Sequence, residues 1–314
     1  MVDRPRPVGP PQPPRRGRRE RSAGSRIGRR VLVLAMLVAG VAVAAWLSMT
    51  AVRSVAAEPP PPPPPPTETA PQLPTLKIVF PEGFTRKEMA RRVAEVNRIA
   101  RENRQLVTKL RQQQYLNITA DHPLPPQFAE ARGKPLEGFL FPATYDFTPE
   151  TTTRQLVERQ LEAFERAWAQ VDMAHARSKN LTPYEVLIIA SMVEKETVAP
   201  QERPLVAAVI YNRLRIGMPL GIDATIRYGL DVPGTDPLRQ SHLQSDNPYN
   251  TRNRLGLPPT PIANPGLASM QAAAHPADVD YLYFVRKPDN VHHFFTASES
   301  EFYAKACEYG YGCG

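Results

Sequence analysis

Glu194 is the residue whose position in this sequence most favours catalysis. It is the first carboxylate after the apolar run VLIIASMV at 186–193, and Lys-Glu-Thr follows it directly. At helical spacing it shares one face with three earlier residues, Leu187, Ala190 and Ser191. A carboxyl group on such an apolar face is desolvated, which favours the neutral form that a general acid needs near neutral pH. Glu194 is therefore the candidate catalytic acid.

Glu196 stands two residues further on and points to roughly the opposite side of the same helix. An alternative interpretation of the motif is that Glu194, Lys195 and Glu196 form an ordinary solvated helix end. Perturbed carboxylates mark active sites in only a fraction of cases, so the motif alone leaves both interpretations open.

The helix that would carry Glu194 has a clear start in the sequence. Thr182-Pro183-Tyr184-Glu185 predicts a capping box with proline at the first helical position. The apolar run continues from there, so we expect one helix from Thr182 toward Thr197. Glu194 would then lie near its C-terminal end.

Apolar spacing and turn residues predict the other elements of an α+β fold. Strands are expected at 76–80 and 281–285, and residues 136–142 have turn and strand character. Helices are expected from Thr85 to about Arg111, from 151–153 to about Ala176, over about Pro204–Ile216 with Gly217 as the C-terminal cap, and over Glu299–Glu308.

Residues 218–266 contain no long periodic segment and are rich in Gly, Pro, Asn and Asp. Loops of this length inside a compact domain are usually functional or disordered. Tyrosines and asparagines recur in IDATIRYG and NPYNTRNRLGLPP, and polar aromatic loops beside a buried acid would suit a carbohydrate groove. An irregular linker is the alternative.

Positive charge is concentrated at the N-terminus. Residues 1–30 hold ten Arg against Asp3 and Glu20, a net charge of +8 that equals the formal charge of the whole chain. The remainder is near neutral, so the basic composition gives no indication that the folded part binds nucleic acid.

Residues 31–52 form an uncharged apolar stretch that is long enough, as a helix, to cross about 30 Å of hydrocarbon. We expect a transmembrane helix rather than a signal peptide, whose apolar core is usually about 7–15 residues long. The arginines before it place residues 1–30 in the cytoplasm and the rest of the chain outside. Residues 53–74 follow as a linker, in which Pro59–Pro66 form a semi-rigid polyproline spacer.

Cys307 and Cys313 are the two cysteines of the chain, and outside the cytoplasm they could form a local disulfide. Free thiols are the alternative. Neither the cysteines nor the His292-His293 pair makes a metal-site pattern, so no metal and no other cofactor is predicted.

Further motifs occur in order along the chain: LEGFLFPATYDF, ASMVEKET, YNRLRIGMPL, IDATIRYG, PYNT, GLPPTPIANPG, AAAHP, and YLYFV with HHFF. Together they resemble the MltG (YceG-like) endolytic murein transglycosylases over roughly residues 136–303. The resemblance implies a small LysM-like α/β unit at 75–135 and a lysozyme-like catalytic domain of mixed helices and strands at 136–314. A single N-terminal membrane anchor with an outward-facing ectodomain is also that family's architecture.

The resemblance places the family's single catalytic glutamate at Glu194. It implies cleavage of the MurNAc–GlcNAc β-1,4 bond inside nascent glycan strands, which leaves a 1,6-anhydro-MurNAc end and makes the enzyme a lyase. Glu194 would protonate the glycosidic oxygen and then, as a carboxylate, take the proton of the MurNAc C6 hydroxyl as that oxygen closes on C1. The substrate's own N-acetyl group can assist, so no second carboxylate is needed as a nucleophile.

Residues of the matching motifs are candidates for contact with the glycan: Asp223, Thr225, Tyr228, Tyr249, Asn250 and Asn264. Asp223 has an alternative, structural role as a cap for Thr225 or for the turn that follows.

The favoured interpretation is a lytic transglycosylase of the inner membrane with a periplasmic catalytic domain. Its partners would be peptidoglycan strands, the membrane, and peptidoglycan synthases or division proteins. Among enzymes, the alternative is a muramidase that admits water and gives reducing ends. Outside enzymes, the alternative is a non-catalytic glycan-binding protein or division scaffold.

Overall fold

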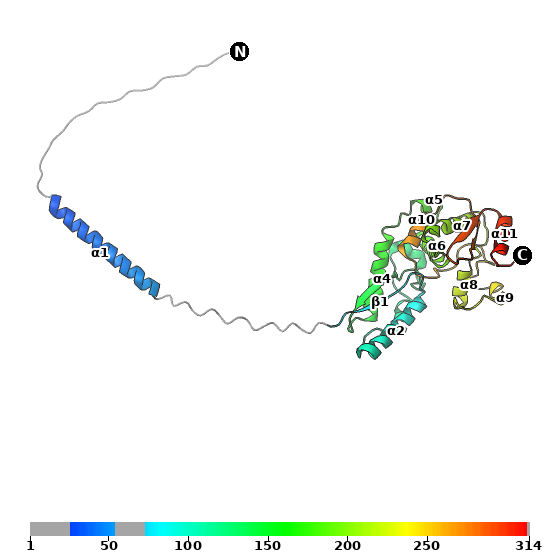
Figure 1. Ribbon diagram of the computed structural model, residues 1–314, viewed down its shortest axis with the longest axis horizontal. Coiled ribbons are helices and arrows are strands. Elements are labelled where there is room, and N and C mark those ends of the chain that lie inside the picture. Colours follow the sequence, from blue (N-terminus) through cyan, green and yellow to red (C-terminus); the bar gives the residue numbers. More distant parts are fainter. Residues whose placement is uncertain (1–25, 54–72, 313–314) are drawn as a thin grey trace, which may run out of the picture. The chain divides into compact units, whose positions relative to one another are not determined.

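The computed structural model describes residues 26–53 and 73–312. The predicted basic arm before residue 26, the proline-rich linker over 54–72 and Cys313 lie outside the described residues. The chain divides into two compact units, Met1–Ala70 and Pro71–Gly314 (Figure 1).

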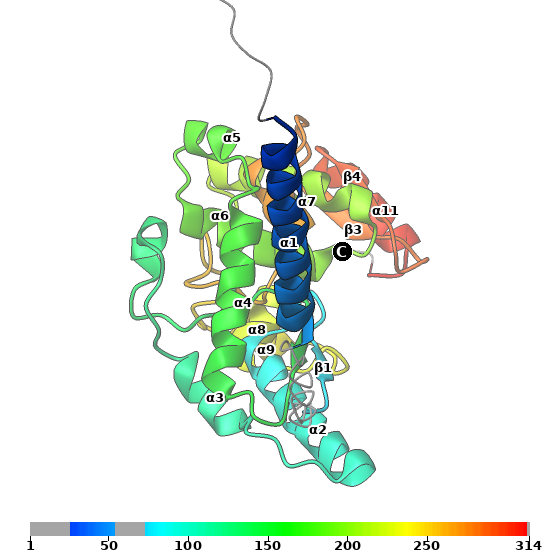
Figure 2. The same ribbon diagram turned by 90° about the vertical axis from the view of Figure 1, so that its left-hand side faces the viewer.

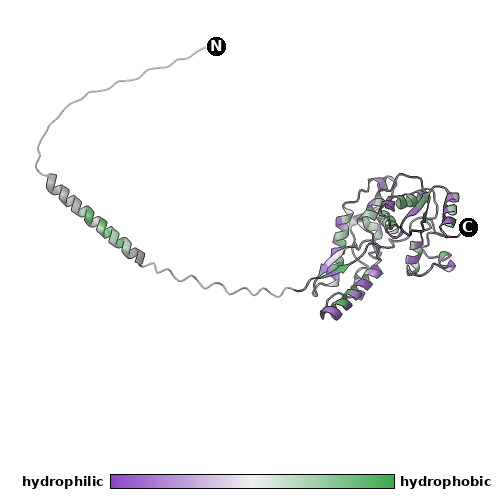
Figure 3. Cartoon of the chain, viewed as in Figure 1, coloured by the Kyte–Doolittle hydropathy of each residue, from purple (hydrophilic) through white to green (hydrophobic). Residues whose placement is uncertain are grey.

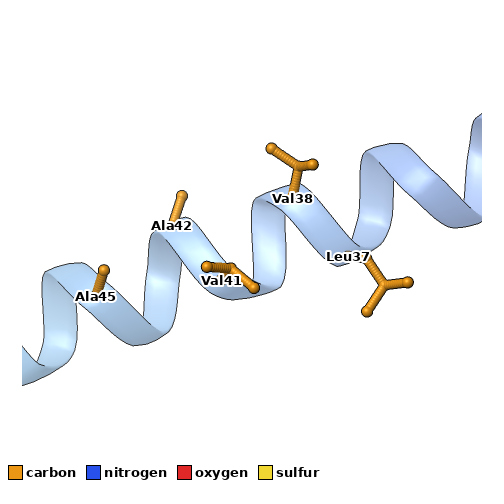
Figure 4. A pocket seen from close by; sticks show the side chains of 5 residues that line it. All are labelled: Leu37, Val38, Val41, Ala42 and Ala45. Carbon is orange, nitrogen blue, oxygen red and sulfur yellow. The ribbon is translucent and has the colours of Figure 1, made fainter.

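The first unit contains α1 (Arg26–Arg53), which includes the apolar stretch at 31–52. Figure 3 shows that the middle of this helix is hydrophobic, and Figure 4 shows five of its side chains. The hollow between them is lined entirely by apolar residues, Leu37, Val38, Val41, Ala42 and Ala45, and offers no group for catalysis. Among the described residues, no helix combines the length and the hydropathy that a membrane crossing requires.

The second unit is mostly helical and contains two small antiparallel sheets (Figure 1). In one sheet β1 (Leu76–Val79) pairs with β2 (Thr144–Phe147). In the other sheet β3 (Tyr283–Arg286) pairs with β4 (His293–Thr296). This combination of helices with antiparallel strands agrees with the expected α+β class.

The helices of the second unit fall into two groups along the chain. The first group contains α2 (Arg86–Arg104), α3 (Gln112–Ile118), the 3-10 helix η1 (Pro126–Ala131), α4 (Thr153–Trp168) and α5 (Ala174–Ser178). The second contains α6 (Pro183–Glu196), the 3-10 helix η2 (Pro200–Glu202), α7 (Arg203–Arg215), α8 (Asp223–Leu230), α9 (Gln240–Leu243), α10 (Leu267–Ala274) and α11 (Glu299–Glu308). Figure 2 shows α2 and α3 at one end of the unit, α5 at the other, and α4 running between them.

α6 is the central helix of this unit. Its predicted capping box is present, with Thr182 as the N-cap and Glu185 three residues later. Every residue from Val186 to Val193 is buried, and α6 packs against α7 and α10. A helix that is apolar on all sides is buried on all sides. After this buried run, Glu194 is the first polar side chain at the C-terminal end of the helix.

One continuous hydrophobic core joins the regions before and after residue 135. It includes residues from both: Ile78, Met89, Val93, Leu187 and Ile189. The strand that closes the first sheet, β2, lies beyond residue 135, so β1, α2, α3 and β2 form a strand–helix–helix–strand unit. The turn between β1 and α2 packs against the end of α6, where Lys195 Nζ donates a hydrogen bond to Gly83 O at 3.2 Å.

The helix expected to run from Thr85 to about Arg111 is shorter in the structure. It ends at Arg104, because Gln105 adopts a left-handed conformation with φ 54° and its N–H returns to carbonyls of the last turn. A separate helix, α3, follows. Apolar spacing alone did not locate this end, since it depends on the backbone conformation of one polar residue.

The helix expected to reach about Ala176 is interrupted. α4 ends at Trp168 and α5 begins at Ala174, with five residues between them, and Asp172 accepts a hydrogen bond from the N–H of Ala174 at 2.8 Å. A short polar side chain that bonds to its own backbone competes with helix continuation.

Other predicted elements agree more closely with the structure. α7 and α11 lie within one residue of their predicted ranges, and β1 and β3 occupy most of theirs. The segment 136–142 is a turn without a strand, whereas β4 was not predicted. The irregular segment 218–266 contains the short helices α8 and α9.

Candidate active site

Glu194 lies in the last turn of α6, and its side chain is only 7% exposed. The residues expected on its face are all buried, namely Leu187, Ala190 and Ser191. Its Oε2 atom accepts a hydrogen bond from the N–H of Gly266 at 3.1 Å, and its Oε1 atom lies 3.9 Å from Nη2 of Arg203. Glu194 is therefore held at the edge of the core and does not form a solvated helix end.

Gly266 is the N-cap residue of α10, so the Glu194 carboxyl group meets the N-terminal end of that helix. The helix dipole favours negative charge at this end. A Cβ atom added to Gly266 would lie 1.9 Å from Oε1 of Glu82. The absence of a side chain at Gly266 is what leaves room for a second carboxyl group here.

Glu82 brings that second carboxyl group from the turn between β1 and α2. Its Oε2 atom lies 3.9 Å from Nη2 of Arg203, the same nitrogen that approaches Glu194. Arg203 is fixed between them, because its side chain is 13% exposed and its Nε donates a hydrogen bond to Ser269 Oγ at 3.0 Å. Burial and the negative charge of Glu194 raise the pKa of Glu82, whereas Arg203 lowers it.

Two hydrogen bonds hold the turn that carries Glu82. Gly83 N donates to Asn264 O at 3.0 Å, and Lys195 Nζ donates to Gly83 O at 3.2 Å. Gly83 has φ +76°, a conformation that other residues rarely adopt. The glycine thus allows the sharp turn that brings its neighbour to Glu194.

Glu196 has different partners. Its carboxyl group accepts a hydrogen bond from the N–H of Ala224 in the first turn of α8, and its carbonyl oxygen accepts one from Nη2 of Arg286 at 2.9 Å. Burial raises the pKa of Glu196 to about 7, opposed by Arg286 and reinforced by Asp223. Glu196 therefore satisfies and stabilises the N-terminus of α8.

Asp223 is the first residue of α8, and its side chain is 47% exposed. Its Oδ1 atom accepts hydrogen bonds from Nε and Nη2 of Arg252 at 2.9 and 2.7 Å. Thr225 is fully buried, and its hydroxyl donates to Ile222 O at 2.7 Å. Asp223 is thus accessible and ion-paired, while Thr225 bonds within its own helix start.

Tyr228 and Tyr249 are partly buried and lie side by side, with ring centroids 5.1 Å apart. Tyr228 Oη donates to Oε2 of Glu137 at 3.0 Å, and Tyr249 Oη lies 2.8 Å from Oγ1 of Thr260. Asn250 is fully buried, and its amide group donates to the carbonyls of two loop residues, Leu243 and Ser245.

Asn264 is fully buried and joins several segments. Its Oδ1 atom accepts the N–H groups of Gly138 and Leu140, both at 2.9 Å. Its Nδ2 donates to Phe84 O and to Oε1 of Glu137, both at 2.9 Å. Glu137 is also buried, and burial raises its pKa to about 7 despite the hydrogen bonds it accepts. This network fixes the turn before α2 against the rest of the unit.

The six residues predicted to contact substrate have partners other than the predicted acid. Within the part of the chain that the structure describes, none of those six side chains has a hydrogen bond or ion pair with the Glu194 carboxyl group. Its partners are Gly266 and Arg203, with Glu82 beside them. Spacing in the sequence did not pair the segment around Glu82 with residue 194.

The His292-His293 pair is divided between surface and core. His293 is buried, with Nδ1 2.7 Å from Oε2 of Glu202, and burial lowers its pKa. His292 is half-exposed and contacts Asp289 at 2.9 Å. Cys307 is disulfide-bonded.

Comparison with other proteins assigns this arrangement to a family. The model of the YceG-like family matches residues 67–308. The endolytic murein transglycosylase of Bacillus subtilis (strain 168) is 32% identical over 221 residues, which cover 67% of this chain and 59% of that protein. The protein of the same name from Streptococcus pneumoniae serotype 2 is 33% identical over 229 residues, 68% of this chain and 41% of that protein.

This chain therefore spans only part of the length of these two relatives. A crystal structure of the yceG-like protein lmo1499 from Listeria monocytogenes superimposes with a TM-score of 0.60 at 30% sequence identity. The superposition covers 72% of this chain and 74% of that one.

Proposed function

The chain belongs to the YceG-like family, and on that premise we propose that it is an endolytic transglycosylase of peptidoglycan with Glu194 as its catalytic acid. The observation that carries the proposal is the position of Glu194. Its carboxyl group follows the buried run Val186–Val193 of α6, its side chain is 7% exposed, and it accepts a hydrogen bond from the backbone N–H of Gly266. The names of the two relatives support the same substrate.

One group that first gives and then takes a proton is sufficient for this reaction. Glu194 protonates the glycosidic oxygen between MurNAc and GlcNAc as the bond breaks. The resulting carboxylate is stabilised by Gly266 N–H and Arg203. It then takes the proton of the MurNAc C6 hydroxyl as that oxygen closes on C1, which restores the acid and leaves a 1,6-anhydro end.

The proposed architecture follows the family. The region around α6 is the lysozyme-like catalytic part, and β1, α2, α3 and β2 are the LysM-like part. Asp223, Tyr228 and Tyr249 keep partial exposure and are proposed to border the glycan groove. Thr225, Asn250 and Asn264 are fully buried, so their contribution is to shape the loops behind it.

The proposed location is the inner membrane, with residues 31–52 as a single span, the N-terminus in the cytoplasm and the catalytic part in the periplasm. The support for this is the sequence itself: an uncharged apolar stretch preceded by ten arginines. Nascent glycan strands near the membrane would then be the substrate, and peptidoglycan synthases or division proteins the neighbours.

Mass spectrometry of purified glycan strands after digestion tests the proposed activity. Anhydro-MurNAc ends at new internal positions are the expected product. Reducing ends would identify a muramidase that admits water, and intact strands would identify a non-catalytic binding protein. A Glu194→Gln digest run in parallel excludes contaminating activity.

A further inference from the structure

We propose that Glu82 is a positioning residue of this active site, which keeps Glu194 in its acid form by offsetting the positive charge of Arg203. The inference rests on the proposed function of Glu194. It assigns to the turn between β1 and α2 a role in catalysis, in addition to any glycan binding by the unit that contains it.

The geometry links the two glutamates through shared neighbours. Nη2 of Arg203 lies 3.9 Å from a carboxyl oxygen of each. Gly266 contacts both as well: its N–H donates to Glu194, and its missing side chain leaves the space that the Glu82 carboxyl group fills. Four segments thus meet at one place: the β1–α2 turn with Glu82, the end of α6 with Glu194, α7 with Arg203 and the start of α10 with Gly266.

The charges explain why a second carboxylate is useful there. Arg203 and the N–H of Gly266 both stabilise the ionised form of Glu194, which is the wrong form for the first step of the reaction. A negative charge on Glu82 acts in the opposite direction, because it neutralises Arg203 and repels a carboxylate at Glu194. The coupling is mutual, and the negative charge of Glu194 is one cause of the raised pKa of Glu82.

The other charged groups near this site do not replace Glu82. From α6 itself, Lys195 directs its Nζ to Gly83 O. From α10, the group in contact with Arg203 is the uncharged Ser269. Glu196, Arg286 and Asp223 form a separate cluster at the start of α8.

Glu82 also differs from Glu194 in exposure, at 50% against 7%. A half-exposed carboxyl group keeps part of its hydration, which opposes the burial and the negative charge of Glu194 that raise the pKa of Glu82. The proposal requires Glu82 to carry its negative charge while Glu194 holds the proton that it gives to the substrate.

The pH dependence of anhydro-product release by the full chain tests the proposal. Glu82→Gln removes the negative charge and leaves Arg203 unbalanced, so Glu194 ionises at lower pH. The alkaline limb of the pH–rate profile should move to lower pH by about one unit. At pH values above this limb the rate should fall about tenfold, and at acidic pH it should stay near that of wild type. Glu82→Asp keeps the charge and should keep the profile close to wild type.

Arg203→Gln supplies a change of opposite sign. Removing the cation leaves Glu82 to act alone, and the alkaline limb should move to higher pH. A merely structural role would lower the rate at all pH values without moving the limb, and that result in both variants would overturn the proposal. If thermal unfolding shows that Glu82→Gln does not fold, Gly266→Ala is used in its place. The added methyl group displaces the same carboxyl group, and the same shift of the alkaline limb is expected.

Glu150→Gln is the matched control, because Glu150 is an exposed glutamate that pairs with Lys109 away from the site. Its profile should match wild type. The results distinguish this proposal from the proposed function. If wild type is active, Glu194→Gln is inactive and Glu82→Gln shows no shift of the alkaline limb, only the role of Glu82 is rejected. Absence of anhydro products from the wild type would reject the function itself.

Discussion

The N–H of Gly266 donates a hydrogen bond of 3.1 Å to the carboxyl group of Glu194, across 72 residues of sequence. Because Gly266 is the N-cap residue of α10, this bond ties the end of the central helix α6 to the start of α10. The same glycine leaves room for the carboxyl group of Glu82. One residue without a side chain therefore determines how two carboxyl groups are placed.

Gly266→Ala should reduce activity with little effect on stability. The backbone of Gly266 has φ −76°, which alanine adopts without strain, but its Cβ would lie 1.9 Å from Oε1 of Glu82. The half-exposed Glu82 side chain can move into solvent, so we expect a nearly unchanged melting temperature. Glycan cleavage at neutral pH should fall by about tenfold, since one pH unit of limb shift corresponds to that factor.

Gly234→Ala is the control for this substitution, because no atom lies within 4 Å of its added Cβ. Activity equal to wild type is expected there. A fully active Gly266→Ala enzyme would show that the placement of Glu82 has no bearing on catalysis.

Glu137 should make the stability of the protein depend on pH. Burial raises its pKa from the ordinary 4.5 to about 7. The stabilising contribution of the neutral form is therefore fully present below about pH 4.5 and is lost as pH rises through 7. The loss is about 3 kcal/mol in the free energy of unfolding, from about 1.4 kcal/mol per pKa unit.

Glu137→Gln resembles the neutral acid and should remove the contribution of Glu137, whereas Glu196, whose pKa is also raised to about 7, keeps its own contribution. Its carbonyl oxygen can still accept from Arg86 N and Asn264 Nδ2, which bond to Oε1 of Glu137 at 2.8 and 2.9 Å. Urea unfolding of both proteins at pH 5 and pH 8 measures the difference. Parallel changes in wild type and variant would contradict the assignment of the pH effect to Glu137.

Much of this arrangement follows from sequence because it is local. The capping box of Thr182 and Glu185 defines the start of α6, and the apolar run that follows predicts its burial. Glu194 is then identified as the carboxyl group that leaves the core. The ranges of α7 and α11 are predicted for the same reason, since they depend on spacing within one segment.

The partners of Glu194 could not be predicted in this way, because they come from distant segments. Glu82 and Gly266 lie in turns more than seventy residues before and after Glu194, and only tertiary packing brings them together. The partners of Asn264 were not predictable either. Its motif suggested substrate contact, and in the structure its side chain forms four hydrogen bonds, with Glu137 and three backbone groups.

A soluble fragment that begins at Thr75 should keep its activity on isolated glycan. Pro71–Gly314 is one compact unit, and the fragment retains β1 and the turn with Glu82. In cells it should also cut mature strands, because the proposed membrane anchor at residues 31–52 and a spacer of about 25 Å from eight prolines are absent. The two measurements are release of anhydro-muropeptides from isolated glycan in solution and cleavage of mature cell wall in cells that produce the fragment.

A folded fragment that is inactive in solution would show that residues before Thr75 contribute to the site. The full chain, assayed in detergent on the same glycan, is the control for that outcome.

The measurement that tests the central claim most directly is glycan cleavage by Glu194→Gln compared with Glu196→Gln. Glutamine keeps the size and the acceptor for Gly266 N–H but has no proton to give, so cleavage should fall by about 10²–10⁴-fold or more while the fold is retained. Glu196→Gln retains an acceptor for Ala224 N–H and should be far milder. A folded Glu194→Gln protein that releases anhydro-muropeptides near the wild-type rate would contradict the assignment. If Glu196→Gln were inactive in the same assay, Glu196 would be identified as the catalytic acid.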